Sequence, residues 1–284
     1  MIEISDIRYC RLGTPDLDRA IEFATGLIGL ELTDRFADCA YLRGDDRDHN
    51  VCYFRGDADD HTLGLELRDV GGLDTAIAEL QAAGVETVRG DTEGAAARRV
   101  ADYATFRDPT GNKVDLVVRP FHSGRRYFPS RDAGITEFSH VGLKTTDAPR
   151  DEKFWSSLFN FRANDWIGAA PLMSFDTVHH RIALFPTTKP GIQHVNFQVE
   201  SVDDIMRSWY FLKDRQVRIQ FGPGRHSTSG AMFLYFEGPD GMVYEYSSGV
   251  RTDCDETWRP RQFPFTAESF CVWGAKPDIP EFRA

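Results

Sequence analysis

The stretch DIRYCRLGTPDLDRAIE, residues 6–22, indicates how the chain is built, because it returns in altered form as EFSHVGLKTTDAPRDEK at residues 137–153. Each copy reads as a short strand and a turn, followed by a helix that begins near Pro15 or Pro149, since proline suits the first turn of a helix. An internal repeat of this kind predicts a chain built from two related modules.

Two further pairs of segments keep the same order along the chain. LGLELRDVGGLDTAIAELQAAGV (63–85) corresponds to HVNFQVESVDDIMRSWYFLKDRQV (194–217), and each predicts a strand followed by an amphipathic helix. FRDPTGNKVDLVV (106–118) corresponds to FEGPDGMVYEYSS (236–248), where a Pro-Thr-Gly or Pro-Asp-Gly turn joins two strands. A strand, a helix and three further strands then occur twice in each half.

This pattern predicts an α+β fold of two tandem modules, in which paired βαβββ units form a curved open sheet. We expect an N-terminal structural module without metal at residues 1–120 and a C-terminal catalytic module at residues 136–250. The linker 119–135 is rich in Arg, Gly and Pro. The tail 251–284 carries several aromatic residues, which could fold back as a lid or merely seal the outside of the second module.

Composition narrows the class of protein. A chain of 284 residues has room for two domains of common size. Its net charge of −11 speaks against a nucleic-acid partner. The five cysteines are scattered and form no CxxC motif, as suits a reducing cytoplasm, and no apolar run approaches the about 20 residues that cross a bilayer. We therefore expect a cytoplasmic homo-oligomer that acts on a small molecule and binds neither nucleic acid nor a membrane.

Three polar residues of the second module lie on three different predicted strands: His140, His194 and Glu245. Positions of this kind can converge on the concave face of a curved sheet. Two neutral imidazoles and one carboxylate form the ligand set of non-haem Fe(II) oxygenases, which leaves adjacent coordination positions open. From the residues alone, the alternative that all three are ordinary sheet residues stays open.

The first module lacks this set. Tyr9 to Asp115 spans 106 residues and His140 to Glu245 spans 105, so the two halves keep register. At the place of the second histidine, the first module has approximately Leu63, which cannot bind a metal. Its concave face is expected to be filled by aromatic and aliphatic side chains: Tyr9, Phe23, Leu65 and Phe106.

The segments FSHVGL, GIQHVNFQVES, GPGRHSTSGAMFLYFEGPDG and MVYEYSSG resemble the type I extradiol ring-cleavage dioxygenases of the vicinal oxygen chelate superfamily. The resemblance covers the architecture of about residues 3–250, and its specific motifs lie in 138–249. It implies Fe(II), or less often Mn(II), bound by His140, His194 and Glu245. It also implies meta cleavage of a catecholic substrate, with both atoms of O₂ entering the product.

The resemblance implies roles for further residues. His180, the second of the pair His179-His180, corresponds to the histidine that takes a proton from the catechol and returns it later. His226 and Tyr235 correspond to a histidine and a tyrosine that hydrogen-bond oxygens of the substrate. We expect the pair in a strand that sends its two side chains to opposite faces, with His179 near the substrate, supporting His180 or at the surface. Simple strand or loop roles for these four residues stay open.

The substrate is expected to be a catechol with an apolar substituent, such as an alkyl or aryl catechol, biphenyl-2,3-diol or a dihydroxylated cumate. This follows from the apolar residues predicted to line the pocket: Trp166, Met173, Phe175, Ile192 and Phe197. The alternatives are a glyoxalase-like metal-dependent isomerase or transferase, and a metal-free ligand-binding protein on the same fold. A cupin-type dioxygenase fits less well, because its motif places two metal-binding histidines a few residues apart.

Overall fold

The computed structural model describes residues 1–283 and arranges them in two sheets, each made of two βαβββ units. The first unit comprises β1 (Ile4–Thr14), α1 (Leu17–Phe23) with the π-helical turn η1 (Ala24–Ile28), β2 (Glu31–Arg35), β3 (Cys39–Arg43) and β4 (Val51–Arg55). The second comprises β5 (His61–Leu67), α2 (Leu73–Ala82), β6 (Thr87–Arg89), β7 (Val100–Arg107) and β8 (Lys113–Pro120), with an added helix α3 (Thr92–Arg98) after β6.

The second module repeats this order. Its units comprise β9 (Ile135–Thr145), α4 (Ala148–Leu158), β10 (Arg162–Ile167), β11 (Ala170–Ser174) and β12 (Ile182–Pro186), then β13 (Ile192–Val199), α5 (Val202–Asp214), β14 (Ile219–Arg225), β15 (Met232–Glu237), the turn η2 (Pro239–Gly241) and β16 (Val243–Ser248). The tail adds β17 (Arg261–Phe263), α6 (Ala267–Phe270) and η3 (Pro280–Phe282). The predicted α+β fold of two tandem modules with four βαβββ units is confirmed.

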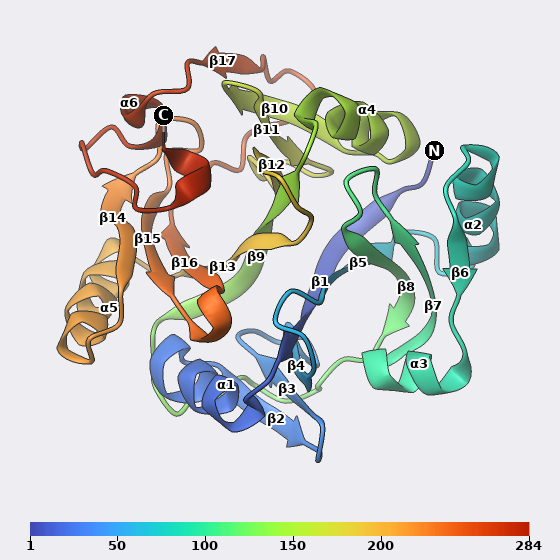
Figure 1. Ribbon diagram of the computed structural model, residues 1–284, viewed down its shortest axis with the longest axis horizontal. Coiled ribbons are helices and arrows are strands. Elements are labelled where there is room, and N and C mark those ends of the chain that lie inside the picture. Colours follow the sequence, from blue (N-terminus) through green and yellow to red (C-terminus); the bar gives the residue numbers. More distant parts are fainter. Residues whose placement is uncertain (284) are drawn as a thin grey trace.

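The two sheets have matching strand orders, β2-β3-β4-β1-β5-β8-β7-β6 and β14-β15-β16-β13-β9-β12-β11-β10-β17 (Figure 1). In each, the first strands of the two units pair antiparallel near the centre, β1 with β5 and β9 with β13. The first helix of each module follows from its local sequence, because Asp16 and Asp147 accept hydrogen bonds from backbone N–H groups three residues on.

The main core runs through both modules. Phe23 of α1 packs against Tyr244 of the second module at 6.1 Å between ring centroids, and Phe159, just after α4, packs against Phe106 of the first at 5.7 Å. The first helix of each module packs against strands of its own sheet, and aromatic side chains at the ends of both helices also contact the other module. Leu65 belongs to the same core, so the prediction that Phe23, Leu65 and Phe106 fill the first module's own concavity is wrong, whereas Tyr9 lies in a separate cluster.

The strands of the second sheet alternate between this core and the opposite face. Val141 and Val195 belong to the main core, whereas their neighbours His140 and His194 point to the other face. That second face carries a smaller cluster of apolar side chains, to which the tail contributes.

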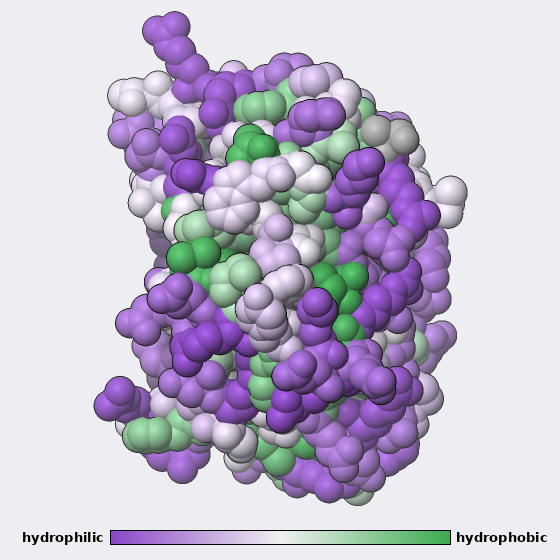
Figure 2. Space-filling model, turned by 90° about the vertical axis from the view of Figure 1, so that its left-hand side faces the viewer, coloured by the Kyte–Doolittle hydropathy of each residue, from purple (hydrophilic) through white to green (hydrophobic). Residues whose placement is uncertain are grey.

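Figure 2 shows a mainly hydrophilic face with small, separate hydrophobic patches. Among residues 1–283, no helix combines the length and the apolar character needed to span a bilayer.

Candidate functional site

His140, His194 and Glu245 lie on the adjacent strands β9, β13 and β16 and converge on one point. His140 Nε2 is 3.0 Å from Glu245 Oε2 and 3.1 Å from His194 Nε2, and His194 Nε2 is 3.4 Å from the same carboxylate oxygen. All three residues are buried. Within residues 1–283, they form the one group of His, Cys, Asp or Glu side chains whose ligand atoms meet closely enough to hold a metal ion.

The spacing and chemistry of these atoms fit a divalent metal. Donors that bind a metal at about 2.1 Å in adjacent octahedral positions lie about 3.0 Å apart. Glu245 Oε2 is buried and has no hydrogen bond of good geometry with any described residue, a state that is costly unless a cation is bound. Two imidazole nitrogens 3.1 Å apart cannot both carry protons, so one metal ion would satisfy all three atoms.

Burial and mutual contact set the charge states of the site. Burial alone would raise the pKa of Glu245, but the close approach of the His140 imidazole, and then of His194 and His226, outweighs it, so this pKa lies well below its ordinary value. Burial lowers the pKa of His140 to about 4. At neutral pH the site therefore presents a carboxylate and a neutral imidazole, the forms that bind metals.

Gln193 orients the second histidine. Its Oε1 accepts a hydrogen bond from His194 Nδ1–H, which leaves His194 Nε2 facing the other two ligand atoms. Neighbouring strand residues normally point to opposite faces, but a register shift between Ile192 and His194 brings these two side chains together. Regular alternation gave no sign of this contact.

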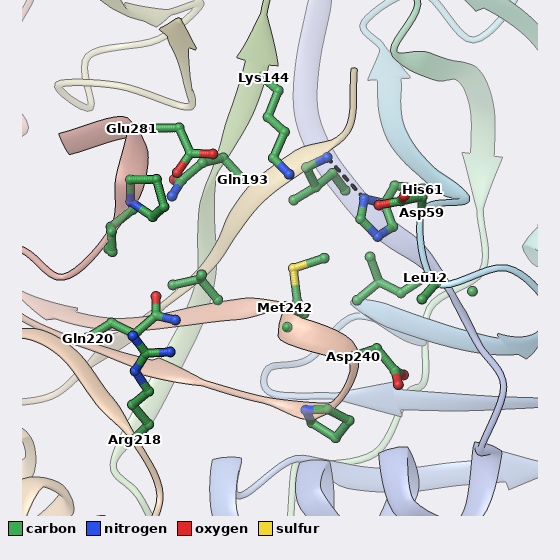
Figure 3. Close-up of a pocket in the computed structure, with 18 of the residues that line it drawn as sticks. Leu12, Asp59, His61, Lys144, Gln193, Arg218, Gln220, Asp240, Met242 and Glu281 are labelled. Carbon is green, nitrogen blue, oxygen red and sulfur yellow. Dashed lines mark hydrogen bonds between the residues drawn. The ribbon is translucent and has the colours of Figure 1, made fainter. Parts of the chain in front are cut away.

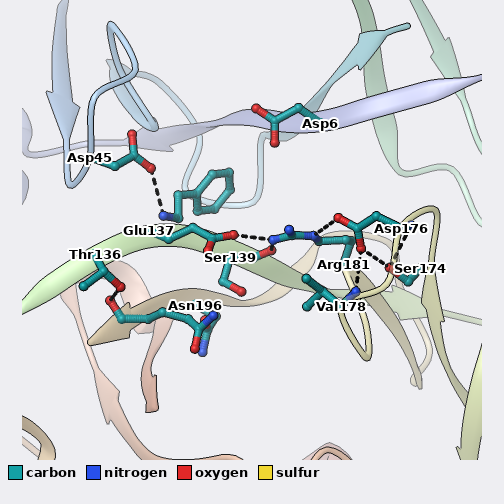
Figure 4. Close-up of polar contacts among 12 residues, drawn as sticks. Asp6, Asp45, Thr136, Glu137, Ser139, Ser174, Asp176, Val178, Arg181 and Asn196 are labelled. Atoms are coloured by element: carbon teal, nitrogen blue, oxygen red, sulfur yellow. Dashed lines mark hydrogen bonds and ion pairs between the residues drawn. The ribbon is translucent and has the colours of Figure 1, made fainter. Parts of the chain in front are cut away.

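The pair His179-His180 lies in the loop before β12 rather than within a strand, so its prediction as a strand pair is wrong. Arg181 holds this loop, since its Nε donates to Asp176 Oδ2 at 2.9 Å and its Nη1 donates to the Ser139 carbonyl at 3.0 Å (Figure 4). Ser139 directly precedes His140 on β9. The loop therefore holds the histidine pair against β9, the strand that carries His140. His140, His194 and Glu245 are called the triad below.

A buried chain of hydrogen bonds ends at His180. Asp165 Oδ2 lies 2.8 Å from His179 Nε2, and Arg261 Nε donates to Asp165 at 3.1 Å. Because the carboxylate accepts, His179 carries its proton on Nε2, and its Nδ1 accepts from His180 Nδ1–H at 3.0 Å. His180 Nε2 is then the unprotonated nitrogen. The two rings contact each other instead of pointing to opposite faces, and His179 is fully buried rather than at the surface.

His180 stands directly beside the triad. Its ring centroid lies 4.2 Å from that of His140. Burial, followed by the proximity of His140 and His179, holds its pKa well below the ordinary value. His180 is therefore a neutral imidazole with a free lone pair at the edge of the site.

His226 and Tyr235 border the triad through Glu245. His226 Nε2 is 3.3 Å from Glu245 Oε1 and 3.2 Å from Tyr235 Oη, while its Nδ1 donates to the Phe270 carbonyl in α6 at 2.9 Å. Burial, and then the charge of Glu245, raise the pKa of Tyr235 well above its ordinary value, so it remains a phenol. The contribution of Phe270 lies far along the chain and had no signal in the sequence.

Much of the predicted pocket lining lies elsewhere. Phe197 packs in the main core against Phe138, at 5.9 Å between ring centroids, because it is three residues from His194 and so points to the opposite face. Met173 belongs to the same core, as does Phe175 just after β11. The prediction that these three residues line the pocket is wrong. Ile192 borders a cavity between the modules instead, and Trp166 donates from Nε1 to Glu152 of α4.

Aromatic side chains from the sheet and the tail cover the face around the triad. The Phe282 ring lies 4.7 Å from Phe185, 5.7 Å from Tyr235 and 6.5 Å from His194. The cluster is completed by buried apolar residues that include Leu172, Ala183, Phe221, Phe233, Phe270 and Ile279. The tail therefore packs over the site itself.

The corresponding place in the first module is occupied by an ion-pair network. Asp115 accepts hydrogen bonds from Tyr9 Oη at 3.0 Å, Arg98 Nε at 2.6 Å and Thr105 Oγ1 at 2.6 Å. Arg98 comes from α3, the helix that has no counterpart in the second module. The carboxylate at this position is thus already neutralised by a side chain.

Comparison with known proteins supports the assignment of the fold. The chain is 26% identical over 270 residues to a biphenyl-2,3-diol 1,2-dioxygenase of Sphingomonas paucimobilis. The aligned region covers 88% of this chain and 90% of that protein. It is 26% identical to an iron-dependent extradiol dioxygenase of Rhodococcus jostii (strain RHA1), over 96% of this chain and 97% of that protein.

Solved structures agree with this likeness. A halotolerant catechol dioxygenase superposes with a TM-score of 0.88 at 23% identity, covering 98% of this chain and 97% of that one. An Mn(II)-bound glyoxalase from Novosphingobium aromaticivorans superposes with a TM-score of 0.87 at 26% identity, covering 100% and 95%. The family model of the Glyoxalase/Bleomycin resistance protein/Dioxygenase superfamily matches residues 6–116 and again residues 137–246. The chain therefore belongs to the Glyoxalase/Bleomycin resistance protein/Dioxygenase superfamily.

Proposed function

We propose that the protein is an extradiol dioxygenase, which cleaves the ring of a catechol beside its two hydroxyl groups and inserts both atoms of O₂. The observation that carries this proposal is the convergence of His140, His194 and Glu245 with the free lone pair of His180 on one buried face. The two extradiol relatives support the reaction class.

The proposed metal is Fe(II), with Mn(II) as the alternative, held by His140, His194 and Glu245. When bound, such a metal supplies attachment points for both catechol oxygens and for O₂, and it allows electron density to pass between them. The protein's part is then to position the substrate, to move its proton and to keep bulk water out.

His180 is the proposed acid–base residue. Its Nε2 would accept a proton from one catechol hydroxyl and later return it to an oxygen of the reacting substrate. The hydrogen bond from His180 Nδ1 to His179, which is held in turn by Asp165, fixes the tautomer in which Nε2 is free. In this proposal His179 acts through His180 rather than on the substrate itself.

His226 and Tyr235 are proposed to bind substrate oxygens. Tyr235 keeps its proton and can donate it in a hydrogen bond, and His226 is anchored from behind by the Phe270 carbonyl. Both contact the Glu245 side of the triad, so a diol attached at the metal would come within their reach.

The apolar side chains that cover the face around the triad support a catechol with an apolar substituent. Phe185, Phe221 and Phe282 offer ring faces and edges and no charge. The proposed substrates are therefore alkyl- and aryl-catechols, biphenyl-2,3-diol or a dihydroxylated cumate. In this arrangement residues 1–120 form a structural module, 136–250 form the catalytic module, and the tail 251–284 covers the substrate.

A second candidate is a glyoxalase-type isomerase, which is favoured by the similarity to the Mn(II)-bound glyoxalase. Such a reaction consumes no O₂, so the two functions can be separated directly. The protein would be loaded with Fe(II) or Mn(II) without air and then offered catechol, 3-methylcatechol or biphenyl-2,3-diol.

The expected result is uptake of one O₂ per catechol and a yellow ring-opened product, with the biphenyl and methyl compounds preferred over catechol. The same preparation would be offered a thiol hemiacetal of an α-ketoaldehyde under nitrogen. Isomerisation of that compound, together with no O₂ uptake on any catechol, would replace the first proposal by the second.

A further inference from the structure

A cavity of about 310 Å³ lies between the two modules and beneath the end of the tail (Figure 3). Its walls come from β1, β4, the start of β5 and the loop before it in the first module, and from β9, β13, β14, the turn η2, residues 242–243, residues 278–281 and Arg283 in the second part of the chain. The triad, His180, His226 and Tyr235 are not among the residues that line it, so it is distinct from the site described above.

Two buried amide groups at this cavity each have a polar atom without a partner. Gln193 Nε2 and Gln220 Oε1 are buried, and neither forms a hydrogen bond with any residue of the described chain. The two residues are 3% and 8% exposed. Buried polar atoms are normally satisfied, so a group that accepts from one amide and donates to the other would complete the cavity.

The charges of the cavity leave one cation available. Arg218 and Arg283 both bind Asp278, and Asp59 binds Lys189. Lys144 forms no ion pair within residues 1–283, although it lines the cavity together with Gln193. A carboxylate placed between this ammonium and the Gln193 amide would be bound by both.

Besides Asp59 and Asp278, two further carboxylates of the protein line the cavity. Asp240 accepts a hydrogen bond from Thr14 Oγ1 at 2.7 Å, whereas Glu281 of the tail has no ion-pair partner in the described chain. A bound acid would meet repulsion from Glu281, so the charge of this residue limits the affinity and gives a test of the site.

We propose that this cavity binds a small organic hydroxy acid. Its carboxylate would bind Lys144 and Gln193 Nε2, and its hydroxyl would donate to Gln220 Oε1. Because Gln193 Oε1 also accepts from His194 Nδ1–H, a ligand that binds Gln193 in the cavity changes the hydrogen bond that orients His194, a member of the triad. This site is additional to the proposed dioxygenase function and does not depend on it.

Malate and succinate form a matched pair of probes, since they differ by one hydroxyl group. Calorimetry would be run without O₂ on metal-loaded and on metal-free protein. We expect one malate per chain in both forms, bound at least fivefold more tightly than succinate.

Three variants test the contacts with the ligand. Lys144→Met should weaken malate binding at least tenfold. Gln220→Leu should remove the preference for malate over succinate, and Glu281→Gln should tighten malate binding. Lys153→Met, at an exposed position on α4, is the matched control and should bind malate as the unaltered protein does.

Three outcomes would overturn the site: equal malate binding in Lys144→Met and Lys153→Met, inorganic phosphate bound as tightly as malate, or mutual exclusion of malate and catechol without O₂.

The link to His194 has its own measurement, the rate at which a chelator captures the metal. Malate should change this rate at least twofold in the unaltered protein and leave it unchanged in Lys144→Met. Equal rates with and without malate in the unaltered protein would remove the link.

Discussion

Asp165 Oδ2 lies 2.8 Å from His179 Nε2, and neither side chain has any exposed surface. A buried carboxylate without a partner would be costly, so this contact and the ion pair with Arg261 define one arrangement of the histidine pair. Through His179 the carboxylate also selects the tautomer of His180. Asp165 is therefore a positioning residue for the proposed acid–base group.

Asp165→Asn should lower kcat at least tenfold and leave metal content and catechol affinity nearly unchanged. The amide keeps the shape of the carboxylate but not its charge, so His179 no longer holds one tautomer and the pH profile of kcat should shift. Steady-state O₂ uptake across pH checks this. Asp214→Asn, an exposed residue at the end of α5, is the control. An unchanged kcat and pH profile in Asp165→Asn would show that the pair is merely structural.

His180→Phe should retain the metal and bind catechol, but turn over about 10²-fold more slowly, the usual scale for loss of a positioned acid–base group. His179→Phe should have a smaller effect, because His180 keeps its imidazole and loses only its orientation. Single-turnover kinetics on metal-loaded protein separates the chemical step from binding. A larger loss in His179→Phe than in His180→Phe would show that His179, and not His180, transfers the proton.

His140→Ala, His194→Ala and Glu245→Ala should each lose most of the bound metal and keep the fold, since each removes one of three protein ligands. Metal content after gel filtration and the far-ultraviolet circular dichroism spectrum measure the two effects. His122→Ala, an exposed histidine in the linker, should retain metal. Full occupancy in any of the three variants would exclude that residue as a ligand.

The repeat made the fold predictable because both halves carry the same turn and helix signals, such as the capping residues Asp16 and Asp147. The aromatic contacts that join the two modules had no such signal. They depend on which apolar faces meet after the sheets have formed, as for Phe106 and Phe159.

The candidate site was predictable where a motif marked it, and less so where strand register mattered. Gly64 occupies the pairing position that Asn196 has in the second sheet, so Thr62, two residues earlier, is the equivalent of His194. The prediction named Leu63, which belongs to the main core. An error of one residue exchanges the two faces of a strand, and the prediction for Phe197 likewise placed it on the wrong face, although it is three residues from His194.

The stability of the metal-free protein should fall as the pH decreases from about 7 to 5. Burial lowers the pKa values of His140, His179 and His180, so in this range the unfolded chain binds more protons than the folded one. A group whose folded pKa is lowered in this way makes stability rise with pH. The depressed pKa of Glu245 acts at lower pH, since its contribution is lost only below its unfolded value of about 4.5.

Thermal unfolding midpoints at pH 5, 6 and 7 check this expectation. The midpoint should decrease toward pH 5, and the midpoint of His180→Phe should decrease less, because this variant lacks one of the buried imidazoles whose pKa is lowered. His122→Ala should show the same decrease as the unaltered protein. A midpoint that is constant over this range, or an equal decrease in His180→Phe, would contradict the argument.

The first module should hold no metal, so that metal-loaded protein contains one equivalent per chain. Asp115 is fully buried, but its carboxylate is already bound to Arg98 and accepts hydrogen bonds from Tyr9 and Thr105, and the register places Thr62 where an imidazole would be needed. Asp115→Asn should therefore lower the unfolding midpoint, because Arg98 loses its buried partner, while the metal content stays at one equivalent. Metal analysis and thermal unfolding of the same preparation separate these effects, with Asp102→Asn as a control in the same sheet. Two equivalents in fully active protein, or loss of metal from Asp115→Asn that remains folded, would assign a metal to the first module.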